Sequence, residues 1–262
     1  KYKIKFSKIQ QVCISQLHGD HFFVLIGLIS TFNLLNRDKE LHIYGPKGIK
    51  EIILLQFKLS KSCVDYPLHF HELSATESQL ILDNEKVEVY TIPLKHRIYT
   101  NGFLFREKKQ ERKLNMPVIG NYPEIEICDY QNLKSGKDFK KEDGSLIPNH
   151  ELTLDPPNPI SYAYCSDTAY DESMVPLIHQ VDLLYHESTF LEEHLELAER
   201  TKHSTALQAG NIAAKAKVKK LLLGHYSSRY KNLEVFLKEA HTVFENTELA
   251  EAGKEIYIDT YS

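Results

Sequence analysis

The sequence predicts an α/β protein whose functional groups lie at one edge of a sheet. Short apolar stretches typical of strands alternate with longer stretches typical of helices. Five of these strands run directly into side chains that can bind a metal ion, and they span residues 12–15, 89–92, 163–166, 181–185 and 221–224. Loops that leave the carboxyl ends of strands gather along one edge of an open α/β sheet, and chemistry collects there. The pattern therefore predicts one cluster of imidazoles and carboxylates.

The predicted elements before residue 106 form a regular series. An apolar, buried helix follows the first strand, and a favourable turn pair, Asp83-Asn84, joins the two strands of a hairpin. In chain order we expect a strand at 12–15, a helix at 22–35, a strand at 41–44, a helix at 47–58, a strand at 69–73, and hairpin strands at 79–82 and 86–92.

Residues 106–159 interrupt this series. The region lacks strong periodicity and is rich in Pro and Gly, so we expect a long stretch without regular structure, which in a compact domain is usually functional or mobile. Two basic runs lie within it, the first with Arg106, Lys108, Lys109, Arg112 and Lys113 and the second with Lys134, Lys137, Lys140 and Lys141. Such runs are often only solvated surface. The net charge of −4 argues against nucleic-acid binding, but phosphate contacts depend on how basic residues cluster rather than on the total.

Alternation resumes after residue 160. Strands are expected at 163–166, 181–185 and 221–224. Helices are expected at 190–200, at 205–216 with Ser204 as the cap, and at 233–243 with Asn232 as the cap.

Composition limits the class of protein. A chain of 262 residues with 42% hydrophobic residues can bury a large core and fits one domain, or one domain with an insertion. No apolar run reaches the roughly 18 residues of a membrane span, so we expect no membrane segment. The four cysteines show no disulfide framework, which favours a reducing cytoplasm.

The ligand types indicate a hydrolytic metal site. Structural zinc sites are usually rich in Cys and closed, whereas His with carboxylate and open positions marks hydrolysis. None of the cysteines forms a Cys-x-x-Cys pair, and the His and Asp candidates exceed what one ion needs. Two ions that share Asp167 would use them all, and paired ions are the usual device for hydrolysing phosphodiesters.

The segment at residues 15–21 is the densest in such groups. It contains His18, Asp20 and His21 between a predicted strand and a predicted helix, so Asp20 and His21 are expected at a helix N-terminus, where backbone amides can hold Asp20. The alternative is that Asp20 only caps the helix and His18 is a surface turn residue.

Several blocks resemble tRNase Z, the 3′-tRNA-processing endoribonuclease family of the metallo-β-lactamase superfamily. The resemblance covers nearly the whole chain in the family's order, and its more specific blocks are Tyr-Gly-Pro-Lys-Gly, His-Glu-Ser-Thr and Ser-Ser-Arg-Tyr, at residues 44–48, 186–189 and 227–230. It implies a four-layer αβ/βα sandwich over residues 1–262, without the N-terminal strands with which relatives begin, and with an inserted tRNA-binding arm at 106–159.

The resemblance also implies a set of metal ligands. One zinc ion would be held by His18, His96, Asp167 and the position of Gln16, and the other by Asp20, His21, Asp167 and His225. The family motif reads His-x-His-x-Asp-His, and its first His is Gln16 in this chain. A neutral amide oxygen is a poorer partner for zinc than an imidazole nitrogen, so the first of the two sites is expected to be weakened.

Roles in catalysis follow from the same resemblance. His203, supported by Glu187, is the expected proton donor to the departing oxygen, Asp20 the group that orients or deprotonates water, and Arg229 a neutraliser of phosphate. Lys108, Lys109, Arg112 and Lys113 are the expected tRNA contacts of the arm.

The implied activity is removal of the 3′ trailer from precursor tRNA, which leaves a 3′-hydroxyl on the tRNA. The implied assembly is a homodimer in which the arm of one subunit holds the tRNA that the other cuts. Two alternatives remain open, namely a phosphodiesterase or 3′ exonuclease of the same fold, and a tRNA-binding protein whose catalysis is impaired by Gln16.

The remaining histidines carry weaker signals. His69 and His71 share one strand face and could mimic a ligand pair, but no third ligand stands near them in the pattern, so we expect a structural role. Surface or packing roles are expected for His42, His179, His194 and His241, and His150 lies in the arm.

Overall fold

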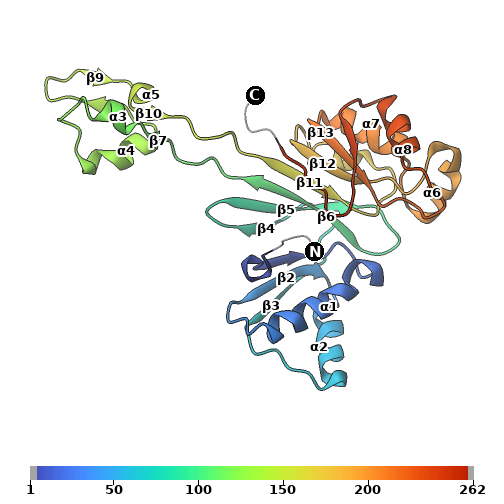
Figure 1. Ribbon diagram of the computed structural model, residues 1–262. Coiled ribbons are helices and arrows are strands. Elements are labelled where there is room, and N and C mark those ends of the chain that lie inside the picture. Colours follow the sequence, from blue (N-terminus) through green and yellow to red (C-terminus); the bar gives the residue numbers. More distant parts are fainter. Residues whose placement is uncertain (1–4, 259–262) are drawn as a thin grey trace. The chain divides into compact units, whose positions relative to one another are not determined.

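A computed structural model describes residues 5–258, which divide into two compact units (Figure 1). The first, here called the body, comprises residues up to 83 together with 88–105 and 161–257. The second, here called the arm unit, comprises residues 84–87 and 106–160, together with residue 258 at the end of the described chain.

A three-stranded parallel sheet forms the first half of the body. Its order is β1-β2-β3, with β1 at Gln11–Cys13, β2 at Leu41–Pro46 and β3 at Leu68–Leu73. Parallel strands need crossover connections, which α1 at Gly19–Leu34 and α2 at Ile49–Ser60 provide. Both helices bury apolar side chains against the sheet, in a core that includes Phe22, Leu25, Ile29, Phe32, Leu41, Ile43, Ile49 and Ile53.

A seven-stranded sheet forms the second half, in the order β14-β13-β12-β11-β6-β5-β4. Its strands are β4 Leu80–Asp83, β5 Val87–Leu94, β6 Thr100–Glu107, β11 Ser161–Cys165, β12 Leu183–Glu187, β13 Lys220–Gly224 and β14 Thr247–Leu249. The helices of this half are α6 Leu195–Thr201, α7 Ala206–Ala216 and α8 Glu234–His241, with short 3₁₀ turns at Phe6–Lys8 in the first half and at Glu172–Met174 and Glu192–His194 here.

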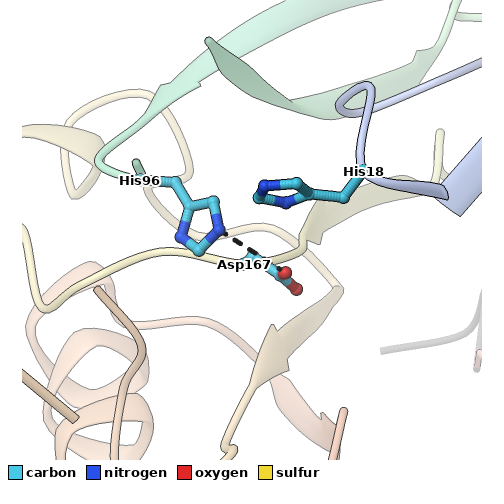
Figure 2. Close-up of side chains that lie close together, drawn as sticks. All are labelled: His18, His96 and Asp167. Atoms are coloured by element: carbon cyan, nitrogen blue, oxygen red, sulfur yellow. Dashed lines mark ion pairs between the residues drawn. The ribbon is translucent and has the colours of Figure 1, made fainter. Parts of the chain in front are cut away.

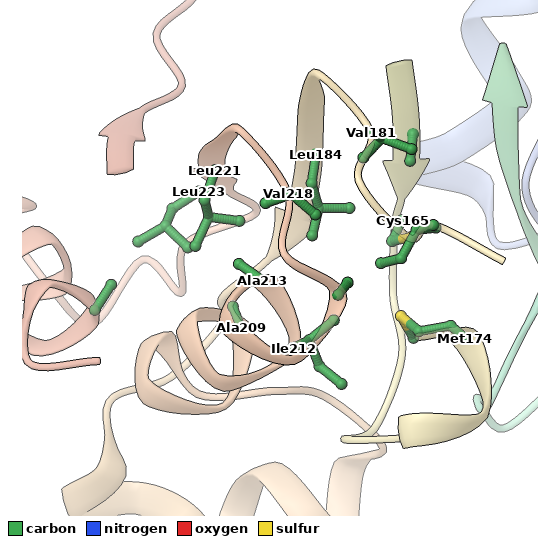
Figure 3. Close-up of a cluster of buried hydrophobic side chains, with 14 of the residues drawn as sticks. Cys165, Met174, Val181, Leu184, Ala209, Ile212, Ala213, Val218, Leu221 and Leu223 are labelled. Carbon is green, nitrogen blue, oxygen red and sulfur yellow. The ribbon is translucent and has the colours of Figure 1, made fainter. Parts of the chain in front are cut away.

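The second core lies between this sheet and its helices. Figure 3 shows small side chains of α7, such as Ala209 and Ala213, close to Leu184 of β12 and Leu221 of β13. Small residues let a helix approach a sheet closely, and these four are fully buried. Two sheets that each carry helices on one face agree with the predicted αβ/βα sandwich.

Several predicted boundaries were wrong. Helix α1 begins at Gly19 rather than at residue 22, with His18 as its N-cap, and Asp20 and His21 lie in its first turn, at the helix N-terminus as expected. Helix α2 begins at Ile49 rather than at 47, because Gly48 adopts a left-handed φ of +101° and donates its backbone N–H to Glu72 Oε1 at 2.8 Å.

The predicted cap of the helix at 205–216 was also wrong. Thr205, not Ser204, caps α7, and it exchanges hydrogen bonds with Gln208 at 3.1 and 3.0 Å in a capping box. Ser204 instead donates to Thr168 O at 2.7 Å.

The last two helices differ from prediction in similar ways. The helix predicted at 190–200 starts as a 3₁₀ turn, and α6 begins only at Leu195. Asn232 accepts a hydrogen bond from the Glu234 N–H at 3.0 Å, but Leu233 occupies the N-cap position of α8. Strands β6 and β14 were not predicted.

The arm unit is not the structureless stretch that we expected. It contains β7 Lys113–Leu114, α3 Met116–Ile119, a 3₁₀ turn at Ile127–Asp129, α4 Tyr130–Lys134, β8 Phe139–Lys140, β9 Leu146–Ile147, α5 Asn149–Leu152 and β10 Thr153–Leu154. A small core of Ile119, Ile125, Leu133, Ile147 and Leu152 holds them together. Elements of two to five residues are too short to show periodicity, which is why the sequence pattern missed them.

Among residues 5–258, no helix has both the length and the apolar character needed to cross a membrane.

Candidate metal centre

Asp167 lies at the centre of a group of imidazoles in the body. It follows the end of β11, and its side chain is 5% exposed. Its Oδ2 lies 3.3 Å from His21 Nε2 and 3.8 Å from His96 Nε2, and its Oδ1 lies 3.2 Å from His225 Nε2. Burial raises the pKa of Asp167, but the hydrogen bond with His21 and the charge of His225 outweigh burial and hold that pKa well below its usual range. The carboxylate is therefore ionised and faces three rings.

His18 and His96 form one possible ligand set with Asp167. One atom of each lies within 4.8 Å of the other two, and Figure 2 shows the three side chains turned toward one another. His96 Nδ1–H donates to the backbone oxygen of Lys202 at 2.8 Å, so its Nε2 carries the lone pair. That Nε2 is buried and has no hydrogen-bond partner among the described residues.

An unpartnered, buried lone pair costs free energy unless something binds it. Burial also lowers the pKa of His96, although its backbone hydrogen bond acts in the opposite sense, and this favours the neutral ring that binds metal ions. The residues present therefore fit a metal ion, and their chemistry is that of a metal centre.

Asp20, His21 and His225 form a second set, again with ligand atoms within 4.8 Å of one another. The Asp20 side chain is 73% exposed and its Oδ2 lies 3.5 Å from His21 Nε2. Asp20 is not the N-cap of α1. That position is occupied by His18, whose side chain makes no capping hydrogen bond. The simple alternative of Asp20 as a helix cap is therefore not what the structure shows.

His225 reaches the site through an unusual backbone. Its φ of +60° is left-handed, a conformation that costs energy for a residue with a Cβ and is often found at functional sites. The preceding residue, Gly224, ends β13, and a Cβ there would lie 2.2 Å from the Tyr185 hydroxyl. Position 224 therefore has no room for a side chain. The His225 ring is held by Thr189, whose Oγ1 lies 2.8 Å from His225 Nδ1.

Gln16 lies inside this group and is fully buried. Its Nε2 donates to Asp167 Oδ2 at 2.7 Å and lies 2.9 Å from His21 Nε2. The amide thus contacts a member of the second ligand set, although the sequence resemblance assigned its position to the first. A rotation of the amide by 180° would offer its oxygen to the same place.

Glu187 and His203 form a buried pair beside the metal ligands. Glu187 Oε1 accepts hydrogen bonds from the His203 ring at 2.7 Å and from the Thr168 N–H at 3.0 Å, and its Oε2 accepts both the N–H and the hydroxyl of Thr189, at 2.9 and 2.7 Å. Burial lowers the pKa of His203, but the hydrogen bond and charge of Glu187 outweigh it and hold that pKa above its ordinary value. His203 is therefore placed to carry a proton.

The rings of the site are in contact with one another. The His203 ring stacks on the His225 ring with 5.3 Å between the ring centres, and its centre lies 5.1 Å from that of the His96 ring. Atoms of Asp167, His203 and His225 form a further group within 4.8 Å. Every expected ligand with an ionisable side chain, namely His18, Asp20, His21, His96, Asp167 and His225, thus belongs to one connected cluster.

Positive charge lies next to this cluster. The guanidinium carbon of the exposed Arg229 lies 5.4 Å from the centre of the Phe190 ring. The centre of that ring lies 6.2 Å from the centre of the His203 ring. The charge of Arg97 also acts on His203, where it opposes the effect of Glu187 on the pKa without cancelling it. Sequence reasoning missed Arg97 and Thr189 as site residues, although Arg97 directly follows a predicted ligand and Thr189 lies in the His-Glu-Ser-Thr block.

His186, which follows a predicted strand, does not join the cluster. Its ring is fully buried, and its Nδ1–H donates to Glu187 O at 2.7 Å. Burial lowers its pKa, which is typical of a packed, neutral histidine.

The basic residues expected to contact tRNA lie in the arm unit. Lys108, Lys109, Arg112 and Lys113 line a cavity of about 770 Å³, together with Lys86, Lys134 and the acidic residues Glu85, Glu107 and Glu111. Arg112 donates to Thr153 Oγ1 at 2.6 Å and pairs with Asp155, so its guanidinium is already bound within the arm unit. Lys109 and Lys113 are exposed.

Comparison with known proteins identifies the family. No family model matches the chain. Ribonuclease Z of Bacteroides thetaiotaomicron is 42% identical over 260 residues, which is 99% of this chain and 82% of that protein, and ribonuclease Z of Cytophaga hutchinsonii is 45% identical over 92% of this chain and 76% of that protein.

Two solved structures share the fold. The short form of human tRNase Z matches with a TM-score of 0.67 and 24% identity over 98% of this chain and 82% of its own. The metallo-β-lactamase fold protein YhfI of Bacillus subtilis matches with a TM-score of 0.62 and 20% identity over 96% of this chain and 79% of its own. These likenesses confirm the predicted fold, and the sequence relatives confirm the predicted family. The chain belongs to the ribonuclease Z family, hydrolases of the endoribonuclease type with a metallo-β-lactamase fold.

Proposed function

We propose that this chain is a zinc-dependent endoribonuclease that removes the 3′ trailer from precursor tRNA and leaves a 3′-hydroxyl on the tRNA. The observation that carries the proposal is the arrangement around Asp167, where four imidazoles and two carboxylates form ligand sets beside a buried Glu187–His203 pair. Membership in the ribonuclease Z family supports the substrate.

Two ions are proposed, with Asp167 shared between them. His18 and His96 would hold one, and Asp20, His21 and His225 the other. Bound ions of this kind supply an activated water and offset the charge that grows on the phosphate. Zinc is proposed because imidazole and carboxylate with open positions suit it.

The side chains divide the remaining work. Asp20, whose side chain is largely exposed, orients the attacking water or accepts its proton. His203 gives its proton to the departing 3′-oxygen of the tRNA, and Glu187 holds the ring in place and favours its charged form. Arg229 and Arg97 add positive charge where the phosphate would lie.

The test uses purified protein and a precursor tRNA with a 3′ trailer. We expect one cut, which yields a tRNA with a 3′-hydroxyl and a trailer with a 5′-phosphate, and we expect a chelator to abolish it and zinc to restore it. A chain that shortens the trailer one nucleotide at a time would be a 3′ exonuclease, and one that cleaves only a chromogenic small diester would be a different phosphodiesterase.

A replacement of Gln16 by His should increase both metal binding and cleavage. Gln16 is a neutral amide in contact with Asp167 and His21, and an imidazole there would be a better zinc ligand. Loss of a mere hydrogen-bond partner of a ligand typically weakens metal binding by about 10–100-fold, so gain of a better ligand should raise zinc content toward two per chain and raise the cleavage rate with it. Metal content by mass spectrometry and cleavage of precursor tRNA measure this.

The control for this variant is Gln56→His, on the exposed face of α2, which should change neither quantity. If the unmodified protein already binds two zinc ions tightly and cuts as fast as Gln16→His, then Gln16 is an adequate ligand. If the unmodified protein binds precursor tRNA but does not cut it, the alternative of a tRNA-binding protein impaired by Gln16 is correct.

The arm unit is proposed to bind tRNA without taking part in chemistry. It has its own core and carries exposed lysines, and its described residues contain no group of three or more side chains placed to hold a metal ion. Glu107 N–H donates to Ile160 O at 2.9 Å, so the two ends of the intervening segment are adjacent and a short Gly-Ser linker can replace residues 108–159. Such a deletion should strip activity on precursor tRNA and spare hydrolysis of a small diester.

A milder variant of the same test replaces Lys109 and Lys113 by Ala. Each lost phosphate contact should reduce the slope of the logarithm of the tRNA-binding constant against the logarithm of the salt concentration by roughly one unit. Equal loss of activity on tRNA and on the small diester, in the deletion or in this variant, would refute the separation of binding from chemistry.

A homodimer is proposed on the basis of unusual apolar exposure. Helix α1 exposes Phe23, Val24 and Leu34, and α2 exposes Leu55 and Leu59, with exposed fractions of 51–83%. Large apolar side chains exposed on neighbouring elements often mark a protein interface. We expect Val24→Glu to shift the protein from dimer to monomer in analytical ultracentrifugation, whereas Thr242→Glu, at an exposed position after α8, should not. A wild-type monomer would contradict the proposal.

The proposed location is the cytoplasm, which agrees with the four free thiols, Cys13, Cys63, Cys128 and Cys165.

A further inference from the structure

A second group of histidines lies on the small sheet of the body. His42 of β2 is the register partner of His69 of β3, and Tyr44 is the partner of His71. The His42 ring stacks against the rings of His69 and His71, with 4.8 and 5.2 Å between the ring centres. Alternate residues of a strand point to opposite faces, so these rings lie on the face opposite Leu41 and Ile43, which are buried against the helices.

Glu40 completes this group, contrary to the expectation that no third ligand lies nearby. It stands two residues before His42 and therefore on the same side of the chain. Its Oε1 lies 3.5 Å from His42 Nε2 and its Oε2 lies 3.4 Å from His69 Nε2. Ligand atoms of Glu40, His42 and His69 all lie within 4.8 Å of one another.

The spacing of these atoms leaves room for an ion, and the two contacts are made by different oxygens of Glu40. A hydrogen bond between an imidazole and a carboxylate normally joins its atoms at about 2.7–3.0 Å, so contacts of 3.4 and 3.5 Å are long. Two ligand atoms that each lie about 2.0–2.1 Å from a tetrahedral zinc ion are separated by about 3.3–3.4 Å. The observed distances fit the second arrangement better than the first.

We propose that Glu40, His42 and His69 bind a divalent transition-metal ion of the zinc type, with water in the remaining position. The site shares no residue with the cluster around Asp167. All three side chains are accessible, with exposed fractions of 59%, 23% and 47%, so an ion can enter from solvent without a change in the fold. The carboxylate offsets half of the charge of the ion.

His71 positions one of the ligands. His42 can bind an ion through Nε2 only if its proton is on Nδ1, and Nδ1 lies 2.9 Å from His71 Nε2. His71 therefore accepts this N–H and fixes the tautomer and orientation of the His42 ring, as the hydrogen-bond partners of metal-binding histidines generally do. His71 is a positioning residue and not a ligand.

An ion at this site would link β2 to β3 through side chains. The two strands are neighbours in a sheet of only three, and Glu40 lies just before β2, so the ion would also fix the start of that strand. Binding to the folded state alone stabilises a protein in proportion to the logarithm of the free ion concentration. The expected role is therefore structural.

The test counts zinc ions after equilibrium dialysis of the full chain against zinc. We expect Glu40→Gln and His69→Ala each to bind one ion per chain fewer than the wild type, while circular dichroism and tRNA cleavage stay unchanged. The matched controls Glu77→Gln and His179→Ala, both at exposed positions, should keep the wild-type number. If either ligand variant keeps every ion of the wild type, the site does not exist.

A second measurement leaves the three proposed ligands unchanged. Addition of zinc to the Asp167→Asn protein should still shift the ¹⁵N resonances of the His42 and His69 imidazoles and should raise the melting temperature. In the same background, His71→Ala should weaken this binding by about 10–100-fold without abolishing it. Unshifted imidazole resonances would overturn the proposal, and unchanged affinity in His71→Ala would overturn the positioning role.

Discussion

Replacement of Asp167 by Asn should remove most of the activity of this protein and at least one of its metal ions. Asp167 is the residue that the two proposed ion sites share, and the low pKa of its carboxyl keeps it negative. An amide keeps the shape but loses the charge that holds the cations. Since the ions are expected to contribute several kcal/mol and 1.36 kcal/mol is tenfold in rate, cleavage of precursor tRNA should fall by about 10³-fold or more.

Metal content and cleavage should be measured on the same preparation of Asp167→Asn. Asp171→Asn, which changes an acidic residue that accepts a hydrogen bond from the Ser173 N–H, is the control and should retain both. An Asp167→Asn protein that keeps its full metal content and its rate would show that the carboxylate is not the shared ligand.

Replacement of His203 by Gln should have the second largest effect, and it should depend on the leaving group. A positioned general acid contributes about 10²–10⁴-fold to a rate, so cleavage of precursor tRNA should fall by that factor. The loss should be much smaller with a bis(p-nitrophenyl) phosphate substrate, because nitrophenolate leaves without a proton. Metal content should be unchanged, because in this proposal His203 is a proton donor and not a ligand.

Two further variants sharpen this test. Glu187→Gln should give an intermediate loss, of about 10–100-fold, because Glu187 acts through the ring that it holds at 2.7 Å. His179→Gln, at an exposed position, should have no effect. If His203→Gln loses zinc, or loses the same factor on both substrates, then His203 is a ligand or a structural residue instead.

The sequence predicted which side chains come together better than it predicted the boundaries of the elements. The parallel register aligns Glu187 with Gly224 and Cys165 with His186, so residues that follow the ends of β11, β12 and β13 must lie at one edge of the sheet. Metal-binding residue types at strand ends are visible in the sequence, and parallel strands bring them together whatever the details of the helices.

What the sequence did not reveal depends on contacts between distant residues. The hydrogen bond of His96 to the Lys202 carbonyl joins residues 106 positions apart, and no local pattern announces it. The same is true of Gln16, whose amide meets Asp167 across 151 positions. The group of Glu40, His42 and His69 escaped prediction because it depends on the pairing of β2 with β3 in a particular register.

The arm unit shows a different limit. Its core of five buried residues, among them Ile119, Leu133 and Leu152, is built from elements that are each too short for a periodic pattern. Polar side chains supply part of its order, since Asn149 donates to the carbonyls of Leu133 and Lys137, both at 2.8 Å. A region rich in Pro, Gly and Lys therefore contains a folded unit that the sequence pattern did not predict.

A zinc-edge anomalous difference map of crystals grown with zinc would test the central claim most directly. We predict a strong peak about 2 Å from ligand atoms of Asp20, His21, Asp167 and His225. We predict a weaker peak between His18, His96 and Asp167, the set to which the resemblance assigns the position of Gln16, because an amide is a poorer zinc ligand than an imidazole. Without any peak within coordination distance of Asp167, the imidazoles around it would not be a metal centre, and the proposed mechanism would be wrong.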